Sequence, residues 1–296
     1  MRQIQIKAPA KINLGLDVIG KRPDGYHDLR MIMQTVSLYD RVKLSATKSP
    51  GVRMKTNLRF LPTDKGNHAY QAAQMLIDEF GITAGVFIEL QKHIPVAAGL
   101  AGGSSNAAAV LEGMNRLFDL GLSQEQLRER GVKIGADVPY CIMKGTALAE
   151  GIGDVLTPLP RIPDCSIVIA KPDVRVSTKF VYTHLTLDEH TQHPQIDEQI
   201  EAIRQGDLRR MCAHCGNVLE SVTIPEHTQI ADLKEEMMAG GALVSMMSGS
   251  GPSVFGVFAD RELAEKVYGK LREKRDKMQD RTQIFLTDPV YGELKE

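Results

Sequence analysis

The chain has 296 residues, 43% hydrophobic and 25% charged, a composition that supplies a sizeable core and excludes collagen-like, coiled-coil and intrinsically disordered proteins. Its 36 basic and 37 acidic side chains give a formal net charge of -1, which excludes the general positive field that gathers nucleic acid or an anionic membrane. We therefore expect no nucleic acid and no membrane among the partners, and any anionic ligand must bind at a local site.

The N-terminal segment has the pattern of a strand from its first residues, without the apolar region and cleavage site of a signal peptide. We therefore expect a cytoplasmic protein. The apolar residues of 12–18 fall on one face of a strand and leave Lys11, Asn13 and Asp17 together on the other face. A turn at 21–25, strand-like segments at 31–33 and 41–44 and a helix over 69–80 follow.

The next strand leads into a glycine-rich loop. Alternating apolar residues predict a strand over 86–90, and the segment 95–106 (P-V-A-A-G-L-A-G-G-S-S-N) comes directly after it. An alanine-rich helix is expected through 107–118, and Ser104 or Ser105 is expected to cap it.

A capping-box pattern at 123–126 starts one more helix in the first half, and 137–139 is expected to be a loop because proline disfavours helical geometry in the residue before it.

The second half of the chain is predicted to form a domain of its own. Clustered prolines then place the boundary near residue 158, which gives domains of 1–157 and 158–296. Helices are expected near 178–186, 195–205, 207–221, 228–239 and 261–275, and strands near 166–170, 243–247, 253–259 and 282–287.

Segment 95–106 has the composition of a phosphate-binding loop. Its three glycines allow the backbone to approach a ligand, and the free N–H groups at a helix start attract an anion. The alternative is a tight turn whose small residues only permit close packing. The Walker pattern and a dinucleotide-binding G-x-G-x-x-G are both absent. A second small-residue loop at 247–253 suggests a cleft between the two domains.

Five motifs, in this order along the chain, carry a family resemblance. They are K-A-P-A-K-I-N-L at 7–14, R-P-D-G-Y-H at 22–27, the loop at 95–106, G-A-D-V-P at 135–139 and S-G-S-G-P at 248–252. Together they resemble the GHMP kinases, the superfamily of galactokinase, homoserine kinase, mevalonate kinase and phosphomevalonate kinase. The resemblance implies a two-domain α+β fold, with a ribosomal protein S5 domain 2-like N-terminal domain, a ferredoxin-like C-terminal domain and the active site between them.

The resemblance also implies a reaction. R-P-D-G-Y-H resembles the branch of the superfamily in which ATP phosphorylates the 2-hydroxyl of a cytidine-diphosphate-linked polyol, on the non-mevalonate route to isoprenoid precursors. Mg²⁺ is implied as the ion that bridges the ATP phosphates, although the sequence indicates no ligands for it. The oligomeric state is left open.

The implied site residues fall into three groups. Asp137 is the carboxylate that accepts the proton of the attacking hydroxyl, and Lys11 is the lysine beside it. The ATP-binding residues are Asn67, Pro95, Val96, Ala97, Ala98, Gly99, Leu100, Ala101, Gly102, Gly103, Ser104, Ser105 and Asn106. The substrate-binding residues are Asn13, Tyr26, His27, Thr178 and Tyr182, with Asp17 as a further candidate.

These assignments have ordinary alternatives. A capping Asp and a solvated strand Lys would explain the catalytic pair, Asn67 could cap a helix, and Tyr182 fits an amphipathic helix face. Two residues depart from the family pattern. Ala101 replaces a common glycine, so that position is expected not to need a positive φ, and Glu150 replaces a basic or small residue near the expected cleft.

Two other functions are compatible with the sequence. One is a GHMP kinase that acts on homoserine or a mevalonate derivative, against which the pair Tyr26-His27 counts. The other is a nucleotide-binding regulatory or RNA-associated module on the same fold, since fold does not fix function. Lys11 and Asp137 count against that second alternative.

Overall fold

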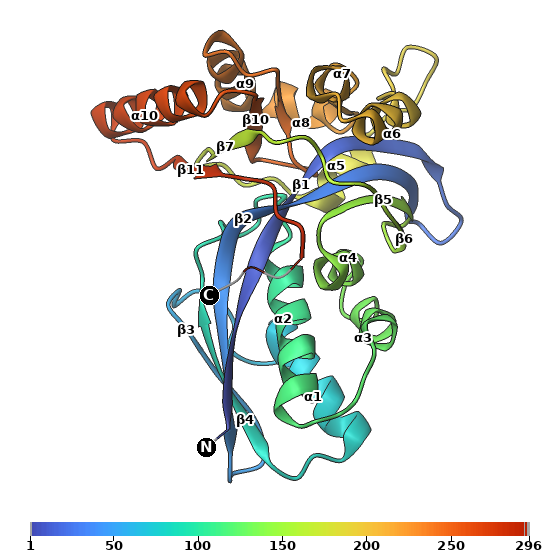
Figure 1. The fold of residues 1–296 in the computed structure, drawn as a ribbon, viewed down its shortest axis with the longest axis vertical. Helices are drawn as coiled ribbons and strands as arrows, with labels where there is room; N and C mark the ends of the chain where they lie inside the picture. The colour runs from blue at the N-terminus through green and yellow to red at the C-terminus, as the bar shows by residue number, and fades with distance from the viewer. Residues whose placement is uncertain (1, 293, 295–296) are drawn as a thin grey trace.

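The computed structural model describes residues 2–292 and 294, which form two β-sheets with helices packed on them (Figure 1). The larger sheet has seven strands and the smaller one has four. A long hairpin of β1 (Gln3–Lys21) and β2 (His27–Thr47) starts in the N-terminal half, and its tip lies beside α6 (Ile196–Gln205) of the C-terminal half. The predicted α+β class is confirmed.

The larger sheet is built around this hairpin. Its order is β3-β4-β2-β1-β8, and β5 and β6 extend it from β2. The remaining strands are β3 (Gly51–Thr56), β4 (Gly85–Gln91), β5 (Thr146–Gly151), β6 (Val155–Pro158) and β8 (Gly216–Asn217). Because residues 8–18 of β1 are buried on both faces, this strand lies in the centre of the molecule.

Two helices cover one face of the larger sheet. They are α1 (His68–Phe80) and α2 (Gly102–Leu117), which lie next to each other in Figure 1. Small residues let α2 approach the sheet closely: a Cβ on Gly113 would lie 2.4 Å from Leu44 Cδ1. α3 (Gln124–Gly131) begins with the predicted capping box at Ser123, and α4 (Val138–Met143) follows it.

The smaller sheet is antiparallel, in the order β11-β7-β10-β9. Its strands are β7 (Ser166–Lys171), β9 (Val244–Met247), β10 (Val254–Phe258) and β11 (Gln283–Thr287). Helices α9 (Gln229–Ala239) and α10 (Arg261–Met278) pack against it. Between β7 and α9 the chain forms α5 (Thr178–His184), α6, α7 (Leu208–Ala213), β8 and α8 (Glu220–Glu226).

The prediction of one helix over 207–221 was wrong. The chain forms α7 and α8 there, with β8 between them, because β8 pairs in parallel with Gly15 and Leu16 of β1. A long-range strand pairing therefore overrides the local helical pattern. The strands β3, β5 and β6 also went unpredicted.

Two helix starts differ from the prediction. The loop expected at 137–139 is the beginning of α4, with Asp137 as its N-cap residue. Pro139 permits this because the N–H groups of a first helical turn have no helical partner to lose. α2 begins at Gly102, so Ser104 and Ser105 lie inside its first turn and do not cap it.

The larger sheet is not confined to the N-terminal half of the chain. β6 ends at Pro158 and β7 opens the smaller sheet at Ser166, yet β8 returns to the larger sheet. The domain division at residue 158 stays a prediction. None of the helices within residues 2–292 and 294 combines the length and the apolarity needed to cross a membrane.

Candidate active site

A cavity of about 1550 Å³ lies between elements of the two halves. Its walls come from β1, the hairpin tip, residues 61–68, the loop 95–106, residues 135–137, α5 and residues 249–250. Apart from the further candidate Asp17, all but two of the predicted site residues line it. The exceptions, Leu100 and Ser105, are each 1% exposed and lie beneath the surface, and Leu100 O accepts a hydrogen bond from Lys11 N at 3.2 Å.

The loop 95–106 reaches the cavity through left-handed backbone. Ala97, Gly99 and Ala101 have φ of 50°, 72° and 53°. The expectation that Ala101 needs no positive φ was wrong: as the N-cap residue of α2 it must turn the chain into the helix. Alanine adopts this conformation at a cost of roughly 1–2 kcal/mol, so the loop holds strain that a glycine at 101 would relieve.

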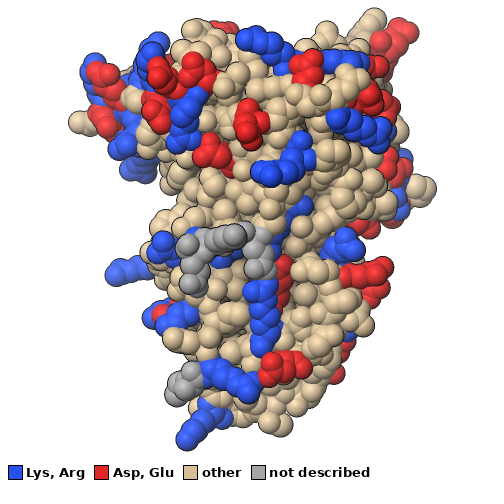
Figure 2. Space-filling view, in the orientation of Figure 1, with Lys and Arg blue, Asp and Glu red and all other residues tan. Residues whose placement is uncertain are grey.

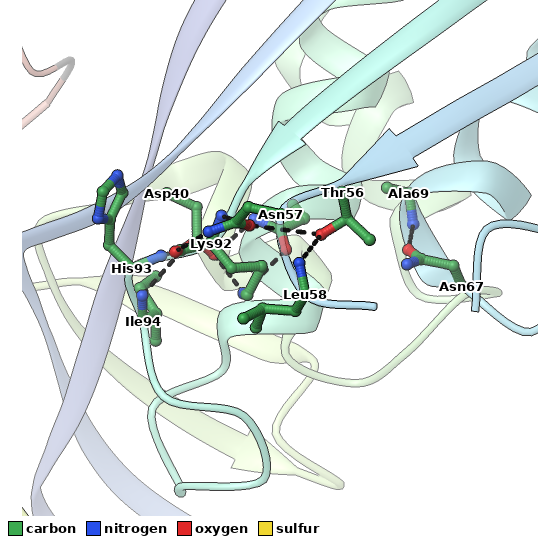
Figure 3. A network of polar contacts seen from close by, with 10 residues as sticks. Asp40, Thr56, Asn57, Leu58, Asn67, Ala69, Lys92, His93 and Ile94 are labelled. Atoms are coloured by element: carbon green, nitrogen blue, oxygen red, sulfur yellow. Dashed lines mark hydrogen bonds and ion pairs between the residues drawn. The ribbon is translucent and has the colours of Figure 1, made fainter. Parts of the chain in front are cut away.

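A buried polar network lies under this loop (Figure 3). Asp40 is fully buried and accepts the backbone N–H groups of His93 at 2.6 Å and Ile94 at 2.8 Å. Lys92 forms an ion pair with Asp40, and Asn106 joins both, donating to Asp40 at 2.8 Å and accepting from Lys92 at 3.1 Å. Burial lowers the pKa of Lys92, and Asp40 opposes that shift.

Sequence reasoning missed Lys92 and Asp40. Lys92 lines the cavity, and a Cβ on Gly102 would lie 3.0 Å from its Nζ, so its ammonium lies against the start of α2. The sequence around Lys92 gave little indication of a buried role, because a lysine at the end of a strand is normally exposed to solvent. A lysine between an apolar strand and the loop was the available clue.

Lys11 projects from β1 into the cavity and is 5% exposed. Its Nζ donates to Asn13 Oδ1 at 2.7 Å and to Gly99 O at 3.2 Å. Within the described part of the chain, no ion pair or hydrogen bond joins Lys11 to Asp137, so the expected contact between them is not direct. The lysine is instead oriented by its own strand and by the phosphate loop.

Asp137 lies half-buried at the N-cap of α4 and lines the same cavity. Its side chain makes no capping hydrogen bond, so the structure does not support the alternative of a capping aspartate. Burial raises the pKa of the nearby Cys141 thiol, Asp137 raises it further and Lys11 lowers it. The Asp137 carboxylate and the Lys11 ammonium therefore both act electrostatically on the Cys141 thiol, although the two side chains do not contact each other.

The second loop joins the phosphate loop to β1. Ser248 Oγ donates to Gly99 O at 2.9 Å and accepts from Asn13 N at 3.3 Å. A Cβ on Gly99 would lie 2.0 Å from Ser248 O, a distance that only glycine allows. At the other end of this loop, the hydroxyls of Thr178 and Ser250 are 2.8 Å apart. The small residues of both loops are thus needed for their mutual contact.

Three aromatic residues line another part of the cavity. The rings of His27 and Tyr182 are 5.2 Å apart at an interplanar angle of 36°, and Tyr26 is 62% exposed. Tyr26 N donates to Asp24 Oδ1 at 3.0 Å, while Arg22 pairs with Asp24 at 3.1 Å. These contacts present an exposed tyrosine beside a histidine at the rim.

Burial is the main cause of the pKa shifts of these side chains. It raises the pKa of Tyr182, with Asp137 as a second cause, and it lowers the pKa of His27, with Lys21 as a second cause. Tyr182 is therefore a neutral phenol, and His27 favours its neutral form at physiological pH.

Asn67 lies on the cavity wall but its amide has local partners. Oδ1 accepts from Ala69 N at 3.0 Å, which caps α1, and Nδ2 donates to Pro62 O at 2.9 Å. The helix-capping alternative is therefore present in the structure. The same contacts hold Pro62, another lining residue, at the wall (Figure 3 shows the cap).

Asp17 does not share the cavity face with Lys11 and Asn13, contrary to the sequence-based expectation. The pairing of β1 with β2 shifts register between Asn13 and Gly15, so the alternation of faces changes there. Leu16 lines the cavity instead, while Asp17 bonds His193.

Glu150 also lies away from the cavity lining. Its Oε1 accepts from Arg30 Nε at 3.3 Å, and Arg30 also forms a bidentate pair with Asp197 of α6. The departure from the family pattern at residue 150 thus adds no charge to the described lining of the cavity.

The cavity is locally basic although the protein is nearly neutral. Four lysines line it, Lys11, Lys21, Lys92 and Lys179, and among the residues that the structure describes Asp137 is the one carboxylate in its walls. On the face drawn in Figure 2, basic and acidic side chains are interspersed instead of grouped by sign. The positive charge needed for polyanionic ligands is therefore concentrated inside the cavity.

Comparisons with known proteins agree with this geometry. The family model "GHMP kinases N terminal domain" matches residues 67–145, and "GHMP kinases C terminal" matches residues 199–277. A 4-diphosphocytidyl-2-C-methyl-D-erythritol kinase from Lachnoclostridium phytofermentans is 56% identical over 265 residues, which are 90% of this chain and 91% of the relative. One of the same name from Geobacillus kaustophilus is 50% identical over 91% of this chain and 93% of its own.

Solved structures give the same picture. The crystal structure of a 4-(cytidine 5'-diphospho)-2C-methyl-D-erythritol kinase matches with a TM-score of 0.83 and 30% identity, covering 98% of this chain and 100% of that one. A homoserine kinase from Cytophaga hutchinsonii matches with a TM-score of 0.80 at 21% identity, over 97% and 95% of the two chains. The second likeness concerns the fold alone.

Proposed function

Because the chain belongs to the 4-diphosphocytidyl-2-C-methyl-D-erythritol kinase family of the GHMP kinases, we propose that it transfers the γ-phosphoryl group of ATP to the 2-hydroxyl of 4-diphosphocytidyl-2-C-methyl-D-erythritol. The product is a precursor of isoprenoids. One observation carries the proposal within the structure: the same basic cavity contains a phosphate-type loop, the carboxylate of Asp137 and an aromatic pocket.

The nucleotide end of the cavity is proposed to bind ATP. The loop 95–106 supplies backbone N–H groups at the start of α2, where the helix dipole favours an anion. The ion pair of Lys92 with Asp40 lies against Gly102 and supports the loop. Asn67 and Pro62, joined by a hydrogen bond, shape the wall where the adenine would lie.

The acceptor end is proposed to bind the cytidine diphosphate group. Tyr26, His27 and Tyr182 surround the base, which stacks on aromatic rings. Thr178, on the helix that carries Tyr182, and Asn13, bonded to Lys11, also line the cavity, so we assign them to the diphosphate and the polyol. The polyol hydroxyl then lies near Asp137.

The transfer itself needs positioning and one proton acceptor. Asp137 takes the proton of the 2-hydroxyl while the oxygen of that hydroxyl forms a bond to the γ-phosphorus. The bond from that phosphorus to the bridging oxygen breaks, and ADP leaves with the electron pair. Lys11, fixed by Asn13 and Gly99, offsets the charge on the transferred group.

Magnesium is proposed to accompany ATP. No group of three or more His, Cys, Asp or Glu side chains within residues 2–292 and 294 could hold a metal ion. In kinases Mg²⁺ takes most of its ligands from phosphate and water and needs one or two protein oxygens. The Ser104 hydroxyl is a suitable donor, since it lines the cavity in the first turn of α2. Bound there, the ion would neutralise phosphate charge.

A comparison of acceptors tests the function. We expect ADP release with 4-diphosphocytidyl-2-C-methyl-D-erythritol and none above background with homoserine or mevalonate, measured side by side at saturating ATP. ADP release with homoserine or mevalonate but not with the diphosphocytidyl substrate would instead assign the protein the activity of a related GHMP kinase. Binding of ATP without transfer to any of the three acceptors would support a regulatory module.

A further inference from the structure

The segment that connects α5 to α6, residues 185–195, forms part of the cavity wall. Leu185 and Leu187 line the cavity directly after α5, the helix that carries Thr178 and Tyr182. This connecting segment therefore borders the pocket proposed for the cytidine base. It has no helix or strand of its own; Leu185 and Leu187 pack against the core at its start, and a second set of contacts holds its far end.

Those contacts are made by His193 and Pro194. His193 Nδ1 lies 2.7 Å from Asp17 Oδ1, and the Asp17 side chain is only 8% exposed. Within the described chain this is the one hydrogen bond to the Asp17 carboxylate. Pro194 packs on β8, where a Cβ on Gly216 would lie 3.0 Å from its ring. A buried carboxylate with a single partner makes that partner important, because losing it leaves the charge uncompensated.

The guanidinium of the neighbouring Arg30 pairs with other carboxylates. Arg30 lies directly opposite Asp17 in the register of β1 and β2. Its guanidinium forms a bidentate pair with Asp197 at 2.6 and 2.7 Å and contacts Glu150 at 3.3 Å. Arg30 thus anchors the first turn of α6, and the carboxylate of Asp17 is left for His193.

We propose that the His193–Asp17 contact is a latch that fixes the connecting segment and thereby determines affinity for the acceptor substrate. The inference rests on the proposed function, because it identifies the acceptor as the molecule that the segment borders. Asp17 lies on the sheet face turned away from Lys11 and Asn13. Both latch residues are therefore positioning residues that act through Leu185 and Leu187 and have no part in phosphoryl transfer.

Kinetics of five variants, one of them a control, test the latch. His193→Ala and Asp17→Ala should each raise KM for the diphosphocytidyl acceptor about tenfold, and the double variant should do no more than either alone. The kcat and the KM for ATP should stay within about twofold of wild type. His193→Asn should restore the acceptor KM, since its amide nitrogen can donate where Nδ1 does. His190→Ala is the matched control, an 85% exposed histidine of the same segment, and should leave all constants unchanged.

Hydrogen exchange supplies a readout that does not depend on the reaction. The amides of 185–192 should exchange faster in His193→Ala and Asp17→Ala than in wild type, while those of 95–106 stay unchanged. Unchanged exchange, an unchanged acceptor KM, or a fall in kcat alone would each overturn the latch. Failure of wild-type enzyme to use the acceptor would overturn the proposed function instead, and exchange would still decide the latch.

Discussion

The two ends of the cavity are held in place by different kinds of contact. The phosphate loop rests on the pair of Asp40 and Lys92, whose side chains are 0% and 4% exposed. The base pocket rests on the hairpin tip, where Arg22 and Asp24 form an ion pair with side chains 37% and 49% exposed. Breaking a buried charge pair costs several kcal/mol, whereas exposed pairs contribute little. We therefore expect changes at the nucleotide end to affect stability and changes at the base end to affect KM.

The largest expected effect lies between the two ends, at Asp137. Asp137→Asn keeps the shape of the side chain but removes the proton acceptor, so kcat should fall by roughly 10²–10⁴ with modest changes in both KM values. Single-turnover transfer measures this directly. Because Asp137 pairs with no described cation, the variant should fold normally, which thermal unfolding and ATP affinity check. Transfer at the wild-type rate would reduce Asp137 to a positioning role.

The next effect concerns the network under the phosphate loop. Lys92→Met should lower the free energy of unfolding by about 3–5 kcal/mol, because it leaves Asp40 buried without its charge partner. Urea unfolding measures the loss. Lys65→Met is the control, since Lys65 is exposed and should change stability little. Equal stability of the two variants would contradict the view that the buried pair supports the loop.

At the base end, Tyr26→Ala should affect binding alone. Removal of a stacking ring should cost roughly 1–3 kcal/mol, seen as a higher acceptor KM with the KM for ATP unchanged. Tyr26→Phe keeps the ring and should behave like wild type. The side chain is 62% exposed, so the unfolding temperature should not change. A parallel rise of both KM values would place Tyr26 on the nucleotide side or make it structural.

The smallest effect is a gain in stability at Ala101. Ala101→Gly should stabilise the protein by up to about 1 kcal/mol, because glycine adopts a φ of 53° without strain. Ala107→Gly, at a buried position inside α2, should instead destabilise it by a similar amount. Loss of stability in Ala101→Gly would mean that the entropy of the added glycine outweighs the strain.

The sequence predicted the parts of the site that depend on local chemistry. The glycine-rich loop, the lysine of β1 and the aspartate before α4 could be assigned by motif, and the structure brings them to one cavity. Alternation along β1 placed Asp17 wrongly, because a register shift after Asn13 exchanges the two faces of the strand. A bulge of this kind depends on the partner strand and leaves little trace in a single sequence.

Contacts between distant segments were beyond local reasoning. Asp40 and Asn106 are 66 residues apart in the chain, yet they share one hydrogen bond under the phosphate loop. The pairing of β8 with β1 joins residues about two hundred positions apart and interrupts an apparently helical stretch. Such contacts are selected by packing and by the need to satisfy buried polar groups, which act only once the chain has folded.

Phosphoryl transfer to the cytidine-linked acceptor is the most direct test of the account. Wild-type protein should be incubated with ATP, Mg²⁺ and 4-diphosphocytidyl-2-C-methyl-D-erythritol, and the product analysed by phosphorus NMR. We predict one new phosphomonoester, coupled to the carbon that bore the 2-hydroxyl, in amounts equal to the ADP formed. ADP without this product, or a phosphoryl group on another hydroxyl, would contradict the proposed arrangement of acceptor, Asp137 and phosphate loop in one cavity.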